Sequence, residues 1–262
     1  MSTSGNTMAT DEPDSAGNNL LLRGLAVLRC FGIERRALGS SDIARMTGLP
    51  QPTVWRICKT LESQGYLKLE RDGARYQVGA AVLTLGYAAL EGLDIATLAK
   101  PPLQDVANRV RGASGLSIRE RGAMLLVQRC EAHGAHITYN MRTGDTLPML
   151  TSASGWAHLV SLSPRERAAS MERLARADPD TAKVATKPMK AAFDAFEKTG
   201  YILNSGMLFP GLVSIAVPFE SRRRGGAYVI SCSATSGVFG TRALQASIGK
   251  AMLKIADELK EV

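Results

Sequence analysis

The segment from Gly48 to Leu67, "GLPQPTVWRICKTLESQGYL", constrains the fold more than any other part of this 262-residue chain. Its apolar residues recur at the spacing that places side chains on one face of a helix. They are Val54, Ile57, Cys58 and Leu61. The opposite face carries Gln51, Thr53, Trp55, Arg56 and Lys59, with no acidic residue before Glu62. This face of hydrogen-bond donors, two cations and an indole is unusual for a helix that only faces solvent.

The flanking residues predict two further helices and a β-hairpin around this segment. A first helix is expected from Leu20 to about Gly32, and a second from Asp42 to Thr47, capped by Ser40 or Ser41. Gly48 supplies the left-handed conformation that ends a helix, and Pro52 suits the first turn of the next. After Gly65, "YLKLE" and "YQVG" read as strands joined by the tight turn "RDGAR". Residues 20–79 therefore have the outline of a winged helix-turn-helix.

In a winged helix-turn-helix the third helix enters the major groove of DNA. Arg56 is the best candidate for reading guanine, because a guanidinium matches the O6 and N7 atoms of that base. Gln51 and Thr53 lie in the leading turn, while Lys59, Arg71 and Arg75 are better placed for phosphates. The full predicted DNA-binding set is Ser41, Gln51, Pro52, Thr53, Trp55, Arg56, Lys59, Arg71 and Arg75. The alternative is a helix docked on another protein, with Trp55 and Arg56 as anchors.

Charge and composition agree with a DNA-binding protein without requiring one. The formal net charge is +8 at pH 7, which favours a polyanionic partner or an anionic ligand. The four cysteines are far apart in the chain and surrounded by apolar residues, so buried free thiols are expected. Residues 1–19 lack the basic start and apolar core of a signal peptide and are expected to form a disordered tail. No segment approaches the ~20 apolar residues of a membrane span, so we expect a cytoplasmic protein.

The remainder of the chain predicts an apolar helix followed by a mixed α and β domain. Residues 80–99 read as one helix too hydrophobic to stand alone in water, with Pro101-Pro102 breaking the pattern before a further helix. Strands are expected in "GLSIRE", "AMLLVQRC", "HITYNM", "GLVSIAVPFE" and "GAYVISCSA". Helices are expected after the loop at residues 143–152, at the capping box "SPRE", at residues 187–198 and at residues 240–260. This order predicts a sheet with helices packed on it.

Residue patterns for catalysis or metal binding are weak. The spacing of Cys130, His133 and His136 puts their side chains on opposite faces of a strand. A structural zinc site usually has four protein ligands, and the sequence offers no candidate for the fourth. His158 follows Ser154 by four residues, but the chain has neither a Gly-x-Ser-x-Gly motif nor an acidic partner for a hydrolase. No phosphate-binding glycine loop is present. The sequence therefore predicts no enzyme, no metal and no cofactor.

The order of these motifs resembles the IclR family of bacterial transcriptional regulators. The resemblance is carried by "SSDIARMTGLPQPTVWRICKTLESQGYL" with its wing, by "MRTGDTLPMLTSASGWAHLVSL" and by "GLVSIAVPFESRRRGGAYVISCSA". It implies an α+β architecture in which an N-terminal winged helix-turn-helix (20–79) is joined by a linker helix (80–99) to a GAF-like effector-binding domain (100–262). It also implies homodimers formed through the N-terminal region, homotetramers formed through the sensing domains, and a pseudo-palindromic double-stranded operator.

The same resemblance implies an effector site in the second domain. The matching positions are Leu147, Ala153, Ser154, Asn204, Leu212, Ser214, Ser231 and Ser233. Ser231 and Ser233 alternate along one strand and should share a face, with Ser214 on a neighbouring strand. The chain departs from the family at Asn204, at Ser214 and at Trp156, where the family often has an acid, a cysteine and a lysine. We expect a small organic effector, a carboxylate or an aromatic acid. A rival interpretation is a small-molecule-binding protein whose three-helix unit contacts another protein.

Overall fold

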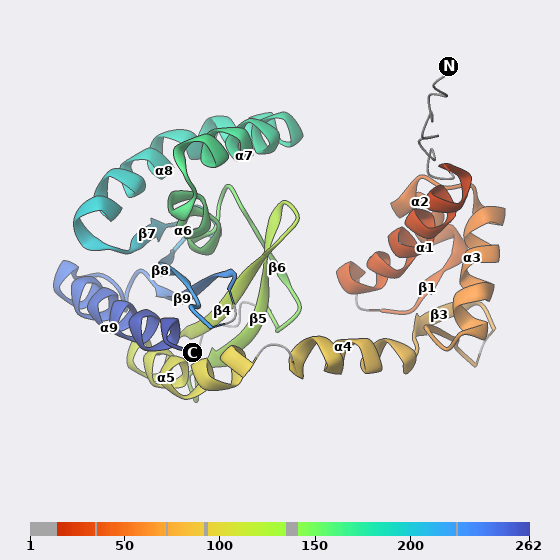
Figure 1. The fold of residues 1–262 in the computed structure, drawn as a ribbon, viewed down its shortest axis with the longest axis horizontal. Coiled ribbons are helices and arrows are strands. Elements are labelled where there is room, and N and C mark those ends of the chain that lie inside the picture. The colour runs from red at the N-terminus through yellow and green to blue at the C-terminus, as the bar shows by residue number, and fades with distance from the viewer. Residues whose placement is uncertain (1–14, 35, 72, 92–93, 135–140, 224) are drawn as a thin grey trace, which may run out of the picture. The chain divides into compact units, whose positions relative to one another are not determined.

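The computed structural model describes residues 15–34, 36–71, 73–91, 94–134, 141–223 and 225–262 (Figure 1). The chain divides into two compact units, Met1–Gly92 and Leu93–Val262. Residues 15–19, expected within the disordered tail, belong to the first helix, and residues 1–14 lie outside the described part.

The first unit is a winged helix-turn-helix. Its elements are α1 (Ser15–Glu34), β1 (Leu38–Gly39), α2 (Ser40–Thr47), α3 (Gln51–Ser63), β2 (Leu67–Leu69), β3 (Arg75–Val78) and α4 (Ala81–Glu91). The apolar stripe of α3 packs into a core with Val27 and Phe31 of α1 and Ile43 of α2. The wing strands pair antiparallel, as predicted. The two-residue strand β1 was not predicted; it adds to the free edge of β3.

The ends of α2 and α3 follow local chemistry, with one correction. The cap of α2 is Gly39 rather than Ser40 or Ser41, because the Gly39 N–H donates to Asp42 Oδ2 at 3.2 Å. Gly48 has a φ of 69° and ends α2 as predicted, and Pro52 lies in the first turn of α3. The turn between the two helices is therefore only three residues long, 48–50.

The single helix expected over residues 80–99 is wrong. Helix α4 ends at Glu91, and α5 (Asp94–Val110) runs straight through Pro101 and Pro102. Two prolines remove two backbone donors from α5. Its buried face nevertheless continues on both sides of them, from Ile95 and Ala99 to Leu103 and Val110. Tertiary packing along this face outweighs the local cost of the prolines.

The second unit is a six-stranded antiparallel sheet with helices on both faces (Figure 1). The strand order is β6-β5-β4-β9-β8-β7. The strands are β4 (Ala113–Glu120), β5 (Ala123–Glu131), β6 (Thr146–Pro148), β7 (Ile202–Ser205), β8 (Leu212–Glu220) and β9 (Ala227–Thr235). Helices α5 and α9 (Arg242–Lys260) share one core with the sheet. Helix α6 (Ala153–Ser161) and α8 (Pro179–Thr199) cover the other face, and α7 (Pro164–Ala177) packs beside them.

Most predicted elements of the second unit are present, with differences in extent. Strands β6 and β7 were not predicted, and α8 begins at Pro179 rather than near Lys187. The expected strand "HITYNM" falls largely on residues outside the described part, and Met141 lies in no strand. The capping box of α7 and the hairpin turn at Arg121-Gly122 are confirmed.

In the described residues, no single helix has the length and apolar character needed to cross a membrane. The broken pair formed by α4 and α5 reaches that length together, but the apolar face of α5 is buried in the second unit.

Candidate nucleic-acid interface and ligand cavity

Helix α3 presents the predicted polar face to solvent. Gln51, Pro52, Trp55, Arg56 and Lys59 are exposed, and Thr53 is half-buried. Trp55 keeps 52% of its surface accessible, which is unusual for an indole. The helix is held from behind by the fully buried Val54 and Cys58. Its outer side chains therefore project from a rigid support.

The charged groups on this face differ in their contacts. The Lys59 ammonium pairs with Glu62 at 2.9 Å, which raises the lysine pKa. The Arg56 guanidinium has no ion-pair or hydrogen-bond partner among the described residues. At the leading turn, Gln51 Nε2 donates to Ser40 Oγ at 3.2 Å, which ties α3 to the start of α2. Arg56 is therefore the cation on α3 that is available to an external acceptor.

The remaining predicted DNA contacts lie at the edges of this unit. Ser41 is exposed in the first turn of α2. Arg71 and Arg75 are exposed on the wing, Arg71 in the turn after β2 and Arg75 at the start of β3. Helix α3 and the wing together present five exposed basic side chains, the predicted Arg56, Lys59, Arg71 and Arg75 and also Lys68 of β2.

A broad apolar groove of about 790 Å³ runs beside the same helix. It is lined by α1, by Leu85 of α4, by Tyr66 and by five residues of α3, which include Thr53 and Arg56 of the predicted DNA-reading face as well as Ile57, Thr60 and Leu61. Several large apolar side chains of α1 and α4 remain exposed here and nearby: Leu20, Leu21, Leu22, Leu25, Leu83, Leu85 and Tyr87. A contiguous apolar surface of this kind marks an interaction face.

The second unit holds a small cavity of about 50 Å³ on the α6-facing side of the sheet. Four of the eight predicted effector residues line it: Leu147, Leu212, Ser231 and Ser233. Ser231 and Ser233 share this face of β9, as their alternation predicts. Ser214 does not line the cavity, but its hydroxyl lies 2.8 Å from Ser233 Oγ.

The other three predicted residues support the cavity region without lining it. Ala153 and Ser154 are buried in the first turn of α6. Asn204 Nδ2 donates to Thr151 O at 3.0 Å and fixes the loop that leads into this helix. Ser152 caps α6 by accepting from the Gly155 N–H at 3.0 Å. The cap occupies this N–H, so it is not open to a ligand carboxylate.

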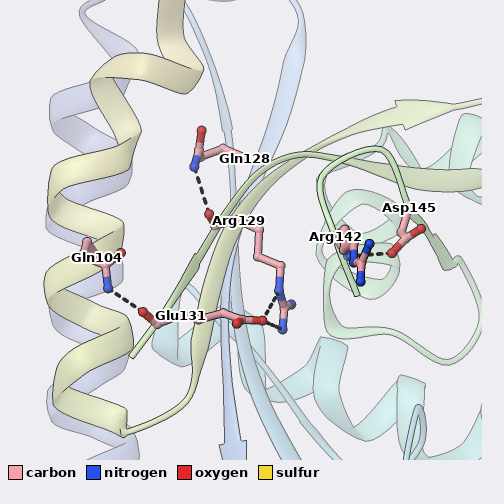
Figure 2. Close-up of polar contacts among 6 residues, drawn as sticks. All are labelled: Gln104, Gln128, Arg129, Glu131, Arg142 and Asp145. Atoms are coloured by element: carbon pink, nitrogen blue, oxygen red, sulfur yellow. Dashed lines mark hydrogen bonds and ion pairs between the residues drawn. The ribbon is translucent and has the colours of Figure 1, made fainter. Parts of the chain in front are cut away.

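A charged residue that the sequence did not single out lines the cavity. Arg129 of β5 has only 14% of its side chain exposed and pairs with Glu131 at 2.7 Å (Figure 2). The Glu131 carbonyl in turn accepts from Gln104 Nε2 of α5 at 2.7 Å. Figure 2 shows the Arg129 side chain extending from β5 on the side of the sheet opposite to α5. The cavity lining thus combines three serines, Arg129 and apolar side chains, and the hydroxyl of one of these serines, Ser114, donates to Leu103 O.

The described residues contain no group of three or more potential metal ligands. Cys130 is buried and His133 is exposed, while His136 lies outside the described part. All four cysteines are buried free thiols, as the sequence predicted.

The geometry defines a class of protein: a DNA-binding winged helix-turn-helix followed by an α+β domain with a polar-lined cavity, which is the organisation of a transcriptional regulator. The family model "Bacterial transcriptional regulator IclR C-terminal" matches residues 87–261, and "IclR helix-turn-helix domain" matches residues 20–71. The chain belongs to the IclR family of transcriptional regulators.

Individual relatives agree with this assignment. An IclR-family regulator from Brucella abortus is 31% identical, with a TM-score of 0.81 over 97% of this chain and 95% of that one. The regulator TsaQ1/TsaQ2 of Comamonas testosteroni is 26% identical over 95% of this chain and 91% of its own. An IclR homologue from Microbacterium hydrocarbonoxydans, solved with 4-hydroxybenzoate, shares the fold at 23% identity with a TM-score of 0.72, covering 93% of this chain and 100% of that one. The curated relatives are named as regulators rather than enzymes.

Proposed function

We propose that this regulator binds a pseudo-palindromic operator as a dimer, and that a small organic acid bound in its second unit alters that binding. The observation that carries the DNA-reading part is the Arg56 guanidinium, exposed on α3 with no partner among the described residues. Such a group at the major groove can bind guanine through two hydrogen bonds. Lys59, Arg71 and Arg75 supply the surrounding phosphate contacts.

The apolar surface of α1 and α4 supports the dimer. Leu20, Leu22, Leu83 and Tyr87 each keep about 60% or more of their surface exposed. A second copy that covered this surface would remove it from water and would pair two recognition helices. The two half-sites would then lie about one helical turn of DNA apart. We expect a dimer, or a tetramer of two dimers, by analytical ultracentrifugation, whereas a monomer at micromolar concentration would contradict this part.

The DNA-binding part is tested by titrating the full chain into duplexes from the DNA upstream of its own gene and into scrambled duplexes. Fluorescence anisotropy at two salt concentrations gives the affinity and its salt dependence. We expect specific binding that weakens steeply with salt, because phosphate contacts release counterions. Absence of salt-dependent duplex binding would instead favour the three-helix unit as a protein-binding module.

The cavity lining supports a carboxylate as the effector head group. Arg129 offers a charge-assisted bond, and Ser231 and Ser233 offer neutral hydrogen bonds. The apolar residues Leu147, Leu208 and Phe209 suit a hydrocarbon or aromatic body. The cavity volume of about 50 Å³ is far smaller than an aromatic acid. Binding of such a ligand therefore requires the cavity to widen.

The effector is tested by a thermal-shift screen of small carboxylates and aromatic acids, with 4-hydroxybenzoate included because a structural relative was solved with it. A ligand at 100 times its Kd adds about 2.7 kcal/mol to the stability of the domain that binds it. A hit should weaken in Arg129→Gln and Ser231→Ala and persist in Arg176→Gln, an exposed arginine of α7. A hit unaffected by Arg129→Gln would remove that residue from the site. A ligand then changes operator affinity only through its different affinity for the binding-competent and incompetent arrangements.

A further inference from the structure

A second, larger cavity of about 310 Å³ lies elsewhere in the same unit. It is bounded by the β4–β5 hairpin, by α6 and by α7, and we call it the hairpin cavity. Its lining residues are Arg119, Arg121, Gly122, Met149, His158, Leu159, Ser170, Arg173, Leu174 and Ala177. None of them lines the effector cavity. Gly115 of the effector cavity and Arg119 are four residues apart on β4, a separation of about 13 Å.

His158 in this cavity is an unsatisfied buried group. His158 is only 4% exposed, and neither of its ring nitrogens has a hydrogen-bond partner among the described residues. Burial lowers the pKa of this histidine, and the nearby Arg119 charge lowers it further. Buried polar groups in native proteins are nearly always paired, with protein, water or an ion. An imidazole left without partners beside a cavity indicates that the cavity itself supplies the partner.

The charges around His158 define what that partner would be. Arg119 and Arg121 come from the hairpin and Arg173 from α7, so three arginines line one cavity. Arg173 Nη2 donates to Ser170 Oγ at 3.0 Å, which is a neutral partner. The one acid paired with these arginines among the described residues is Glu120, 3.6 Å from Arg121 Nε. The neighbouring acid of α7, Glu172, is paired with Arg176, which does not line the cavity.

We propose that the hairpin cavity is a second ligand site. It binds an organic oxyanion through Arg119 and Arg173, and this oxyanion supplies the His158 ring with a hydrogen-bond partner. Guanidinium groups form paired, charge-assisted bonds with phosphate and carboxylate oxygens. A cavity of about 310 Å³ is larger than a bare phosphate requires. Its remaining walls are apolar, formed by Met149, Leu159 and Leu174. The ligand class is therefore a phosphate or carboxylate head on a short apolar body.

The test uses the full-length protein and isothermal titration calorimetry with two probes, inorganic phosphate and phenyl phosphate. Inorganic phosphate reports the head group alone, and phenyl phosphate adds an apolar body. We expect phenyl phosphate to bind the more tightly of the two. Arg119→Gln and Arg173→Gln should each weaken it by about tenfold or more, since each removes a charge-assisted bond. Both side chains are exposed at the surface, so the variants should fold normally.

Arg176→Gln is the matched control, because it removes the same charge from the same helix outside the cavity. Ser231→Ala is the second control, because it alters the effector cavity instead. Binding that survives both controls and is lost in Arg119→Gln and Arg173→Gln supports the hairpin cavity. Equal loss in Arg176→Gln indicates nonspecific charge and overturns the proposal. If neither probe binds, the proposal is also overturned. Loss of binding in Ser231→Ala alone reassigns the ligand to the effector cavity.

Discussion

Ser214 of β8 and Ser233 of β9 face each other in register, with their hydroxyl oxygens 2.8 Å apart. Ser233 also lines the effector cavity, whereas Ser214 does not. The hydroxyl of Ser214 therefore orients a group that the cavity presents to a ligand. This arrangement connects the cavity wall to the adjacent strand.

Removing either hydroxyl of this pair should lower stability by about 1 kcal/mol, because the remaining hydroxyl is left without its partner. Ser214→Ala combined with Ser233→Ala should cost no more than one single change, since no unpaired hydroxyl remains. Urea unfolding of the three variants and the parent measures this directly. Simple addition of the two single effects would show that the hydroxyls do not interact.

Arg56→Ala should lose about 1–3 kcal/mol of discrimination between the operator and scrambled DNA, because a bidentate contact to guanine is removed. Competition anisotropy with both duplexes measures the change. Arg45→Ala is the control, since Arg45 is an exposed arginine of α2 already paired with Asp42. If Arg56→Ala weakens both duplexes equally, Arg56 contacts the backbone rather than a base.

Lys59→Ala should weaken binding to every duplex and reduce the slope of log K against log salt by about one, as expected for one lost phosphate contact. The lysine must exchange its Glu62 partner for phosphate, so the loss in affinity should be modest. Lys254 of α9 provides a matched lysine in the other unit, exposed and paired with Glu258. An unchanged slope in Lys59→Ala would exclude this contact.

The first unit could be predicted closely because its signals are local. The turn glycine, the early proline and the apolar spacing of α3 act within a few residues of one another, and the structure follows them. Strand β1 could not be predicted in this way, because it exists only through its pairing with β3, more than 30 residues later. The prolines of α5 gave a strong local signal that tertiary packing overrode.

The role of Arg129 in the cavity wall was missed for a specific geometric reason. From Leu126, regular alternation along β5 would place Gln128 and Cys130 on the cavity side. The register with β4 shifts between Leu116 and Ser117, and this bulge adds one residue to β5. The bulge moves Arg129 onto the face of Leu126, so both line the cavity. A one-residue shift reverses every side chain beyond it, and no local sequence signal marked the shift.

Trp156 is a core residue rather than a residue of the effector cavity. It is 1% exposed, and its Nε1 donates to Leu150 O at 2.7 Å. Trp156→Ala should destabilise the protein by about 3–5 kcal/mol through the space it leaves. Trp156→Phe should cost about 1–3 kcal/mol, mainly because the Leu150 carbonyl loses its donor. A negligible loss in Trp156→Phe in urea unfolding would show that the hydrogen bond contributes nothing measurable, whereas equal losses in the two variants would show that the vacated space does not.

His158 should make stability depend on pH in a defined direction. Its pKa in the folded protein is below the ordinary value of 6.5, so between the two values the unfolded chain binds more protons. The free energy of unfolding should therefore fall as the pH drops below 6.5. The stability that the neutral His158 ring contributes is lost once the pH has fallen below the pKa of the folded protein. His158→Leu should reduce this fall between about pH 7.5 and pH 5.5, whereas His133→Leu, at an exposed position, should not.

The same measurement connects the histidine to the hairpin cavity. An oxyanion beside His158 favours the protonated ring and offsets the lowering caused by burial and Arg119. Phenyl phosphate titrates at about pH 6 itself, so at saturating concentration it affects the pH profile of both proteins, but it should reduce the acid-induced loss of stability more in the parent than in the His158→Leu variant. If phenyl phosphate changes the two profiles equally, the anion does not contact His158. The low pKa then reflects only a buried imidazole in the core of the second unit.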